Sequence, residues 1–267
     1  RFKGTYSKTN QVSSREKMLE KLEIIEVDEV DNAALKLSFP LAARSGDYPV
    51  TVENVSKSYG ETLVFKDANM SIARGEKVSF VGRNGEGKST MLKAILGEIE
   101  VEGKCELGHN VKVGYFAQNQ ASLLDSDLTI FQTVDEVAKG EIRTQIKNIL
   151  GRFMFSGDDI DKKVSVLSGG EKTRLAMVKL LLEPVNLLIL DEPTNHLDLK
   201  SKDVLKEALL AFEGTLILVS HDRDFLQGLS QKVFEFKDHR VIEHFESIDD
   251  FLERNKIKNI AEINLNK

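Results

Sequence analysis

The chain has 267 residues, of which 30% are charged and 41% hydrophobic, and its formal net charge is −6. This length allows one large domain with appendages, and the acidic balance disfavours a broadly basic nucleic-acid-binding protein while leaving a local basic patch possible. A single cysteine, Cys105, excludes an internal disulfide and favours a reducing compartment, and no apolar run is long enough to span a membrane.

The first 27 residues are polar and favour a helix, which the capping-box spacing of Ser13 and Glu16 would start. Through residue 23 the segment holds six Lys or Arg against three Glu. A solvated helix face is the simpler interpretation. The alternative is an arm that contacts nucleic-acid phosphate through Arg1, Lys8 and Arg15. Because the chain starts without a methionine and has no signal-peptide pattern, we expect a fragment of a longer cytoplasmic protein.

The following segments predict a mixed α/β domain. Residues 28–46 are expected to form a connector, and the alternating run 34–39 within it predicts a short edge strand before Pro40. Residues 48–116 show a mostly β pattern. The apolar runs 187–190 and 216–219 are typical of parallel strands buried on both faces. A hairpin is expected near 233–242. Helices are expected at about 128–138, 141–153, 169–183 and 248–258.

The stretch from Gly82 to Ser89 fits the pattern G-x-x-x-x-G-K-[ST] at every fixed position. An apolar run at 77–81 predicts a strand before it, and a periodic segment predicts a helix after it. Strand, glycine-rich loop and helix together predict a phosphate cradle lined by backbone N–H groups. In such a loop Lys88 reaches the β- and γ-phosphates and the Ser89 hydroxyl binds Mg²⁺. The expected nucleotide-binding residues are Gly82, Asn84, Gly85, Gly87, Lys88, Ser89 and Thr90.

Two carboxylates, Asp191 and Glu192, end the apolar run 187–190. Acidic residues at the C-terminal end of a buried strand lie at the ligand edge of an α/β sheet. Asp191 is therefore placed to hold the Mg²⁺ shell, and Glu192 to polarise an attacking water as general base. The simpler interpretation, two surface carboxylates, is weak beside a phosphate loop.

The segment from Leu167 to Glu171 predicts a second phosphate-binding helix terminus. Ser168 and Glu171 have capping-box spacing, while Gly169 and Gly170 leave the first turn bare, so an anion can approach its N–H groups. A plain helix cap is the alternative interpretation of this segment taken alone.

Together these motifs resemble the ATP-binding cassette (ABC) ATPases over about residues 48–245. The resemblance implies a P-loop NTPase core of mostly parallel strands, an antiparallel β subdomain and a helical subdomain at about 119–167. It implies that Gln118 links Mg²⁺ and water to the helical subdomain, and that His221 contacts the γ-phosphate. It further implies that Tyr59 stacks on adenine and that Asp198 lies in the loop facing a second cassette.

In that family two cassettes pack head to tail, so that residues 168–171 of one complete the ATP site of the other. A lone cassette is therefore expected to be a weak ATPase. The implied catalytic residues are Glu192, His221, Gln118 and Lys88. The implied Mg²⁺ ligands are Ser89, Gln118 and Asp191.

Two motifs, L-S-G-G-E-K at 167–172 and D-E-P-T-N-H-L-D at 191–198, resemble the ABC-F class of tandem-cassette proteins, many of which bind the ribosome. This resemblance implies ATP and Mg²⁺ as cofactors, and a second cassette and the ribosome with its tRNA as partners. The alternatives are the nucleotide-binding subunit of a membrane transporter and a DNA-repair or condensin-type ATPase. The implied domains are the end of an interdomain linker helix at 1–27, a connector at 28–46, a second cassette at 47–248 and a C-terminal helix and tail at 249–267.

Overall fold

The computed structural model describes residue 40 and residues 42–117, 120–140, 142–155, 157–195 and 197–254. The chain divides into two compact units, residues 1–36 and residues 37–267, and all described residues belong to the second. The predicted linker helix, the run 34–39, Gln118 and the C-terminal tail beyond residue 254 lie outside the described residues.

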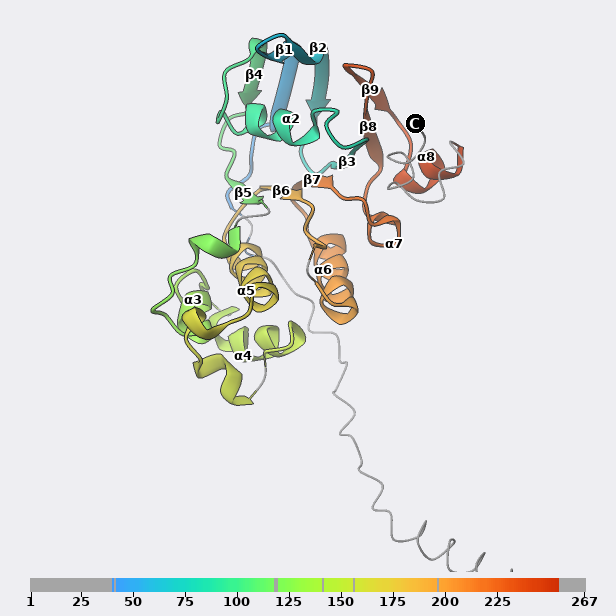
Figure 1. Cartoon of the computed structure of the whole chain (residues 1–267). Coiled ribbons are helices and arrows are strands. Elements are labelled where there is room, and N and C mark those ends of the chain that lie inside the picture. The colour runs from blue at the N-terminus through green and yellow to red at the C-terminus, as the bar shows by residue number, and fades with distance from the viewer. Residues whose placement is uncertain are drawn as a thin grey trace, which may run out of the picture. The chain divides into compact units, whose positions relative to one another are not determined.

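Two β-sheets and a group of helices make up this unit (Figure 1). The strands are β1 (Val50–Tyr59), β2 (Thr62–Ile72), β3 (Lys77–Gly82), β4 (Glu102–Leu107), β5 (Val113–Phe116), β6 (Leu187–Asp191), β7 (Thr215–Val219), β8 (Lys232–Lys237) and β9 (Arg240–His244). The helices are α2 (Lys88–Ile95), α3 (Ile130–Asp135), α4 (Ile142–Arg152), α5 (Gly169–Leu182), α6 (Leu199–Ala211), α7 (Arg223–Leu226) and α8 (Ile248–Arg254). Short 3₁₀ turns lie at η1 (Gln120–Leu123), η2 (Gly157–Asp161) and η3 (Val164–Val166).

The six-stranded sheet has the order β5-β6-β7-β3-β8-β9 and is parallel except for β9. Every residue of β6 and β7 is buried, as the two apolar runs predict. Alternate side chains of β6 enter different cores, because successive residues point to opposite faces. Leu187 and Ile189 pack with α2 and the small sheet, whereas Leu188 and Leu190 pack with α5 and α6.

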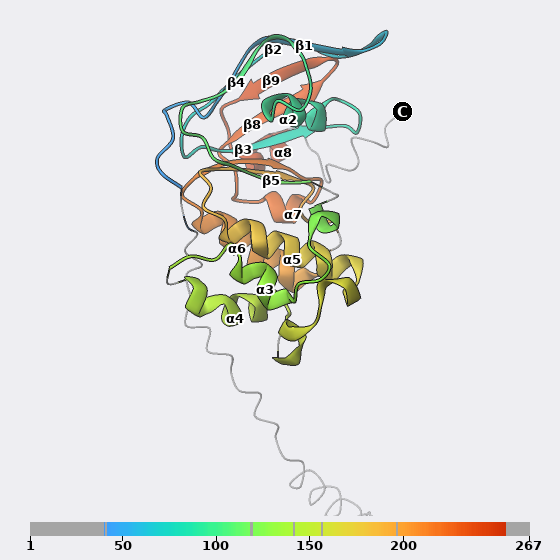
Figure 2. The same ribbon diagram turned by 90° about the vertical axis from the view of Figure 1, so that its left-hand side faces the viewer.

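The layers follow from these two cores (Figure 2). The three-stranded sheet and α2 cover one face of the large sheet, and α5 and α6 cover the other, with α3 and α4 packed beyond α5. The parallel strands therefore have both faces covered. Their carboxyl ends remain available for polar residues.

The small sheet is antiparallel, with the order β2-β1-β4. This confirms the expected antiparallel subdomain at the front of the domain. Its strand β4 was not expected, because five of its six residues are exposed and carry no apolar alternation. Residues 120–166 hold η1, α3, α4, η2 and η3, as the expected helical subdomain requires.

The predicted α/β fold is confirmed at the level of these layers. Helix α3 is shorter than the expected 128–138, because Thr129 forms a capping box with Gln132 and starts the helix at Ile130. Within the described part of the chain, no helix is both long and apolar enough to cross a membrane.

Candidate functional site

The glycine-rich loop connects the central strand β3 to helix α2. Gly82 has φ 153°, and a Cβ there would lie 2.4 Å from the carbonyl oxygen of Phe236. Gly87 caps α2 with φ 96°, and a Cβ there would lie 2.6 Å from Val64 Cγ1. Both positions therefore need glycine for backbone conformation and for close packing, which explains two fixed letters of the motif.

Lys88 begins α2 and is buried, with 7% of its surface exposed. Its Nζ donates hydrogen bonds to the carbonyl oxygens of Gly82, at 2.8 Å, and Arg83, at 2.9 Å. Burial lowers the pKa of this ammonium group, and the nearby charges of Glu192 and Asp191 oppose that shift. The lysine is thus held as a cation by its own loop and by two carboxylates that follow β6.

Asp191 is the last residue of β6 and is 8% exposed. Burial raises the pKa of its carboxyl group, and a hydrogen bond with the Ser89 side chain and the charge of Lys88 oppose the shift. The pairing brings the hydroxyl of α2 against the carboxylate of β6. These are the hard oxygen ligands that Mg²⁺ prefers.

Glu192 follows β6 with an unusual backbone conformation, φ 54°. Only a few per cent of non-glycine residues adopt positive φ, and such strain is often found at functional sites. Its N–H donates to the carbonyl of Val219 at 2.9 Å, and its carbonyl accepts from Asn195 N–H at 3.3 Å. These bonds hold the turn that carries the Glu192 side chain into the cleft.

The carboxyl group of Glu192 is the most perturbed acid of the site. Burial raises its pKa from 4.5 to about 7, a hydrogen bond from the backbone of His221 opposes this shift, and the charge of Asp191 adds to it. A group that titrates near neutrality is suited to accept a proton. Glu192 Oε1 is buried and has no hydrogen-bond partner among the described residues.

His221 follows β7 and faces Glu192. Its Nε2 lies 3.4 Å from Glu192 Oε1, and its Nδ1 is buried without a hydrogen-bond partner among the described residues. Burial lowers the pKa of the imidazole, and the positive charge of Lys88 lowers it further, which favours the neutral ring. Two buried polar atoms without partners, one on each side chain, leave room for hydrogen bonds to a bound molecule or water.

These residues share one cleft of about 440 Å³. It brings together residues from the loop after β3, from α2, and from the ends of β6 and β7 with the turns that follow them, at the carboxyl ends of three neighbouring parallel strands. A Cβ at Gly85 would meet no atom within 4 Å, so the loop backbone faces open space there. The lining residues are Asn84, Gly85, Gly87, Lys88, Ser89, Thr90, Asp191, Glu192, Asn195, Val219 and His221.

The arrangement fits a polyphosphate with a divalent cation. Loop N–H groups, the start of α2 and the Lys88 ammonium supply positive charge, and Ser89 and Asp191 supply oxygen ligands. The described residues hold no group of three or more His, Cys, Asp or Glu that could enclose a metal ion. A site with few protein ligands is typical of Mg²⁺ that is also bound by substrate phosphates.

Comparison with known proteins agrees with this geometry. The model of the ABC transporter family matches residues 65–195. The chain is 44% identical over 256 residues to ABC transporter F family member 5 of Arabidopsis thaliana, covering 94% of this chain and 37% of that protein. It is 37% identical over 254 residues to the Probable ATP-binding protein YbiT of Escherichia coli O157:H7, covering 94% and 48%. The chain carries an ABC-F cassette.

Solved structures support the fold of this cassette. A bacterial Atm1-family ABC exporter with ATP bound is similar with a TM-score of 0.67 and 21% identity, over 96% of this chain and 47% of that one. The protein cbiO1 from Clostridium perfringens, part of the ABC transporter complex cbiONQ, is similar with a TM-score of 0.62 and 28% identity, over 80% and 94%. The chain spans less than half the length of the curated relatives it matches.

The signature segment of the cassette, residues 168–171, lies at the start of α5 and outside the lining of the cleft. The predicted capping box is present: Ser168 Oγ accepts from the Glu171 N–H, and the Glu171 carboxylate accepts from the Ser168 N–H at 2.8 Å. The side-chain hydrogen bond from Ser168 is the main reason that the pKa of Glu171 is lowered. The helix start is therefore already formed and exposed.

Arg174, more than one turn into α5, connects this helix to Asp198, the residue expected in the loop that faces a second cassette. Its Nη1 lies 2.8 Å from Asp198 Oδ2, and its guanidinium lies 5.3 Å from the ring centroid of Phe155. Asp198 also caps α6 by accepting from Ser201 N–H at 2.9 Å. The sequence pattern predicts no role for Arg174, which only continues a helical pattern. It predicts none for Asn195 either, which lines the cleft within the motif at 191–198.

Among the described residues predicted to bind the nucleotide, Gly82 and Tyr59 do not line the cleft. Tyr59 ends β1 with 52% of its surface exposed, and Lys57 Nζ lies 5.0 Å from its ring centroid. An exposed ring leaves a face for stacking, so its contact with adenine stays a prediction. Gln118 lies outside the described residues, and its role also stays a prediction.

Proposed function

We propose that this cassette binds ATP with Mg²⁺ in the cleft and hydrolyses it when a second cassette completes the site. The observation that supports this most strongly is the position of Glu192. Its buried Oε1, which has no hydrogen-bond partner in the described part of the chain, faces the cleft that also contains Lys88 and the Ser89–Asp191 pair. A phosphate loop, oxygen ligands and a base near neutrality are the parts that phosphoryl transfer to water requires.

In this proposal each side chain has one task. Lys88 and the loop N–H groups hold the β- and γ-phosphates, and Ser89, Asp191 and Gln118 hold the Mg²⁺. The metal, when bound, neutralises charge on the phosphate oxygens. Glu192 accepts a proton from the water whose oxygen attacks the γ-phosphorus; the bond from that phosphorus to the bridging oxygen breaks, and ADP leaves with the electron pair of that bond. His221, whose ring lies beside the Glu192 carboxylate, donates a hydrogen bond to the γ-phosphate.

The proposal includes a second cassette because the signature segment does not line its own cleft. The start of α5 presents exposed N–H groups, and its capping box satisfies only part of them. A phosphate bound by the partner cassette would meet those groups. We therefore propose that Ser168, Gly169, Gly170 and Glu171 act on the partner's nucleotide. The isolated chain is then a weak ATPase, and turnover rises with its concentration.

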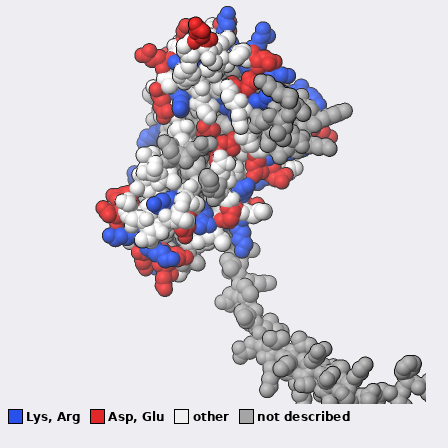
Figure 3. All heavy atoms as spheres, viewed as in Figure 1, with Lys and Arg blue, Asp and Glu red and all other residues white. Residues whose placement is uncertain are grey.

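At the level of the whole protein, we propose the second cassette of an ABC-F translation factor that acts on the ribosome. The similarity to two ABC transporter F family members, each more than twice as long as the matched part, supports a tandem protein. On the face shown in Figure 3, Lys and Arg are interspersed with Asp and Glu. The proposed contacts to RNA phosphate are those expected from the sequence, through Arg1, Lys8 and Arg15, which lie outside the described residues.

The decisive test is ribosome co-sedimentation of the full-length tandem protein with Glu192→Gln, in the presence of ATP. The variant should retain ATP, keep the cassettes closed and stay bound to ribosomes. The same protein with Lys88→Ala, which should bind nucleotide more weakly at this cassette, is the matched control. Co-purification with a membrane permease and equal absence of both variants from the ribosome pellet would favour the transporter subunit instead.

A further inference from the structure

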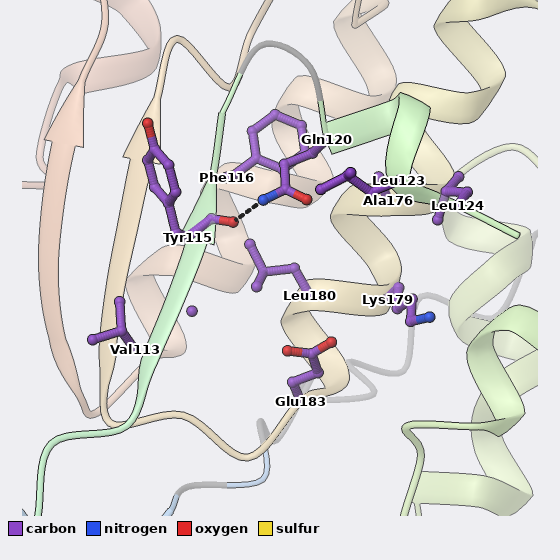
Figure 4. A pocket seen from close by; sticks show the side chains of 11 residues that line it. Val113, Tyr115, Phe116, Gln120, Leu123, Leu124, Ala176, Lys179, Leu180 and Glu183 are labelled. Carbon is purple, nitrogen blue, oxygen red and sulfur yellow. Dashed lines mark hydrogen bonds between the residues drawn. The ribbon is translucent and has the colours of Figure 1, made fainter. Parts of the chain in front are cut away.

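The start of α6 is held by contacts from α5. The second half of α5, with Ala176 and Leu180, borders a groove that it shares with β5 and η1 (Figure 4). Its first half carries Arg174, whose Nη1 donates to Asp198 Oδ2 at 2.8 Å. Asp198 in turn caps α6, because its other carboxylate oxygen accepts from Ser201 N–H at 2.9 Å. Helix α6 therefore begins at a fixed position, and the side chains of its first turn have a defined reach.

Lys202, at the end of that first turn, reaches from α6 to the turn that follows β7. Its N–H donates to the Asp198 carbonyl at 3.0 Å, so its backbone belongs to the fixed start of the helix. Its Nζ donates to Asp222 Oδ2 at 2.7 Å. The two side chains are 32% and 24% exposed, so water screens this ion pair less than it screens a pair at the open surface.

Asp222 directly follows His221 and uses both of its carboxylate oxygens. One accepts from Lys202, and the other accepts from Phe225 N–H at 3.1 Å and caps α7. The Asp222 N–H donates to Ser220 Oγ at 3.1 Å, on the other side of His221. Burial raises the pKa of Asp222, but the hydrogen bonds from Lys202 and Phe225 and the charge of Lys202 outweigh it, so the pKa is lowered and the carboxylate stays ionised.

The position of this turn decides how His221 meets Glu192. The His221 N–H donates to the Glu192 carboxylate, and the ring Nε2 lies 3.4 Å from Oε1 of the same group. Both contacts come from one residue, so a shift of the turn would move the N–H and the ring together. A displacement of about 1 Å at a reacting group can lower a rate by about 100-fold.

We propose that Lys202 is a positioning residue for ATP hydrolysis: through Asp222 it fixes the turn that holds His221 against Glu192. This role rests on the function proposed above for the cleft. Lys206, one turn further along α6, makes a comparable link to α7, because its Nζ donates to the Asp224 carbonyl at 2.6 Å. That link does not involve the residue next to His221, so Lys206 separates the positioning of His221 from the general attachment of α6 to α7.

ATP turnover by the 267-residue chain tests the proposal. Lys202→Met keeps the apolar stem and loses the charge, so it should lower kcat by about tenfold and change the KM for ATP by less than about twofold. Lys202→Arg should restore most of the lost kcat, since a guanidinium group also pairs with a carboxylate. Asp222→Asn keeps an oxygen that caps α7 and should match Lys202→Met. Lys206→Met is the control and should keep kcat within about twofold of the parent.

A second substitution asks whether Lys202 acts through His221. Added to His221→Ala, Lys202→Met should lower kcat by less than a further twofold or so, because losses that pass through one residue do not add. An equal loss in both backgrounds would overturn the proposal. So would parent-like kcat in both Lys202→Met and Asp222→Asn while Glu192→Gln abolishes turnover, which would leave the proposed function intact.

Hydrogen exchange gives a measurement that needs no ATP. The His221 N–H should exchange about tenfold faster in Lys202→Met than in the parent or in Lys206→Met. Equal exchange rates in the two methionine variants would overturn the proposal. If the parent chain hydrolysed no ATP, the function proposed for the cleft would be contradicted, and the exchange rates would still decide whether Lys202 holds His221 in place.

Discussion

The two phosphate-binding helix starts of this cassette differ in how their polar groups are satisfied. Around the start of α2, Lys88 and Asp191 are buried and Glu192 is half-buried, and their pKa values are displaced from the usual ones. At the start of α5, Ser168 is exposed and Glu171 partly exposed, and they bond to each other. Both segments offer unpaired N–H groups at a helix N-terminus to an anion. The start of α2 does so among buried charges, and the start of α5 does so at the surface.

This difference separates two kinds of site. The α2 side holds charges that cost free energy when buried and gain partners when a ligand arrives. The start of α5 is already formed by its own capping box and needs no ligand to hold its side chains in place. We therefore expect substitutions on the α2 side to change chemistry and pH dependence strongly, and substitutions on the α5 side to have modest effects on stability.

The largest effect is expected for Glu192→Gln in a protein that contains both cassettes. Loss of the general base should lower ATP turnover by roughly 10²–10⁴-fold while ATP binding is retained. Phosphate release and nucleotide binding measure the two quantities. Unchanged turnover would reject the assignment of Glu192 and break the contrast between the two helix starts.

The same substitution should alter the pH dependence of stability in the nucleotide-free chain. The folded-state pKa of Glu192, about 7, is above its usual 4.5, so the stabilising effect is present at low pH and is lost as pH rises through about 7. Between pH 5 and pH 8, the parent chain should lose about 2–3 kcal/mol of unfolding free energy through this group. Glu192→Gln should not show that loss. Urea unfolding at both pH values measures this, and parallel curves for variant and parent would contradict it.

Lys88→Ala should weaken ATP binding by roughly 10–100-fold, because charge-assisted hydrogen bonds to phosphate contribute about 1.5–3 kcal/mol. Lys93→Ala removes the same charge from the exposed side of the same helix and serves as the control. Titration with a fluorescent nucleotide measures both. Equal affinity of the two variants would show that Lys88 does not contact the nucleotide.

The smallest effect is expected at the signature segment. Ser168→Ala removes the helix cap and should cost about 1 kcal/mol of unfolding free energy. Ser168→Asp keeps a capping oxygen and should cost less, but its charge should repel the partner's phosphate and lower turnover in the tandem protein. If Ser168→Asp retained full turnover, the segment would act as a cap alone.

The predicted features that the structure bears out are those with a strong local physical cause. The runs 187–190 and 216–219 could be assigned to buried strands because no polar residue interrupts them, and both are fully buried. The spacing of Ser168 and Glu171 predicted the first residue of α5 correctly. Strand β4 could not be found, because its exposed residues carry no pattern and only pairing with β1 makes it a strand.

The candidate site shows the same limit. The motif predicted that Glu192 follows a buried strand, but not its positive φ or its distance of 3.4 Å from His221, because both depend on the turn that Val219 holds. The ion pair of Arg174 with Asp198 could not be predicted from the sequence pattern, because it joins residues that are 24 positions apart. Tertiary contacts of this kind are outside what spacing can report.

That ion pair has an evolutionary consequence. Arg174 lies against Phe155 and Asp198, and its buried Nε finds no acceptor within the described chain, so its surroundings tolerate little exchange of one member alone. A lineage that lost the carboxylate at 198 would leave an uncompensated cation between two helices. We therefore expect positions 155, 174 and 198 to change together among descendants of this cassette, as one inherited unit.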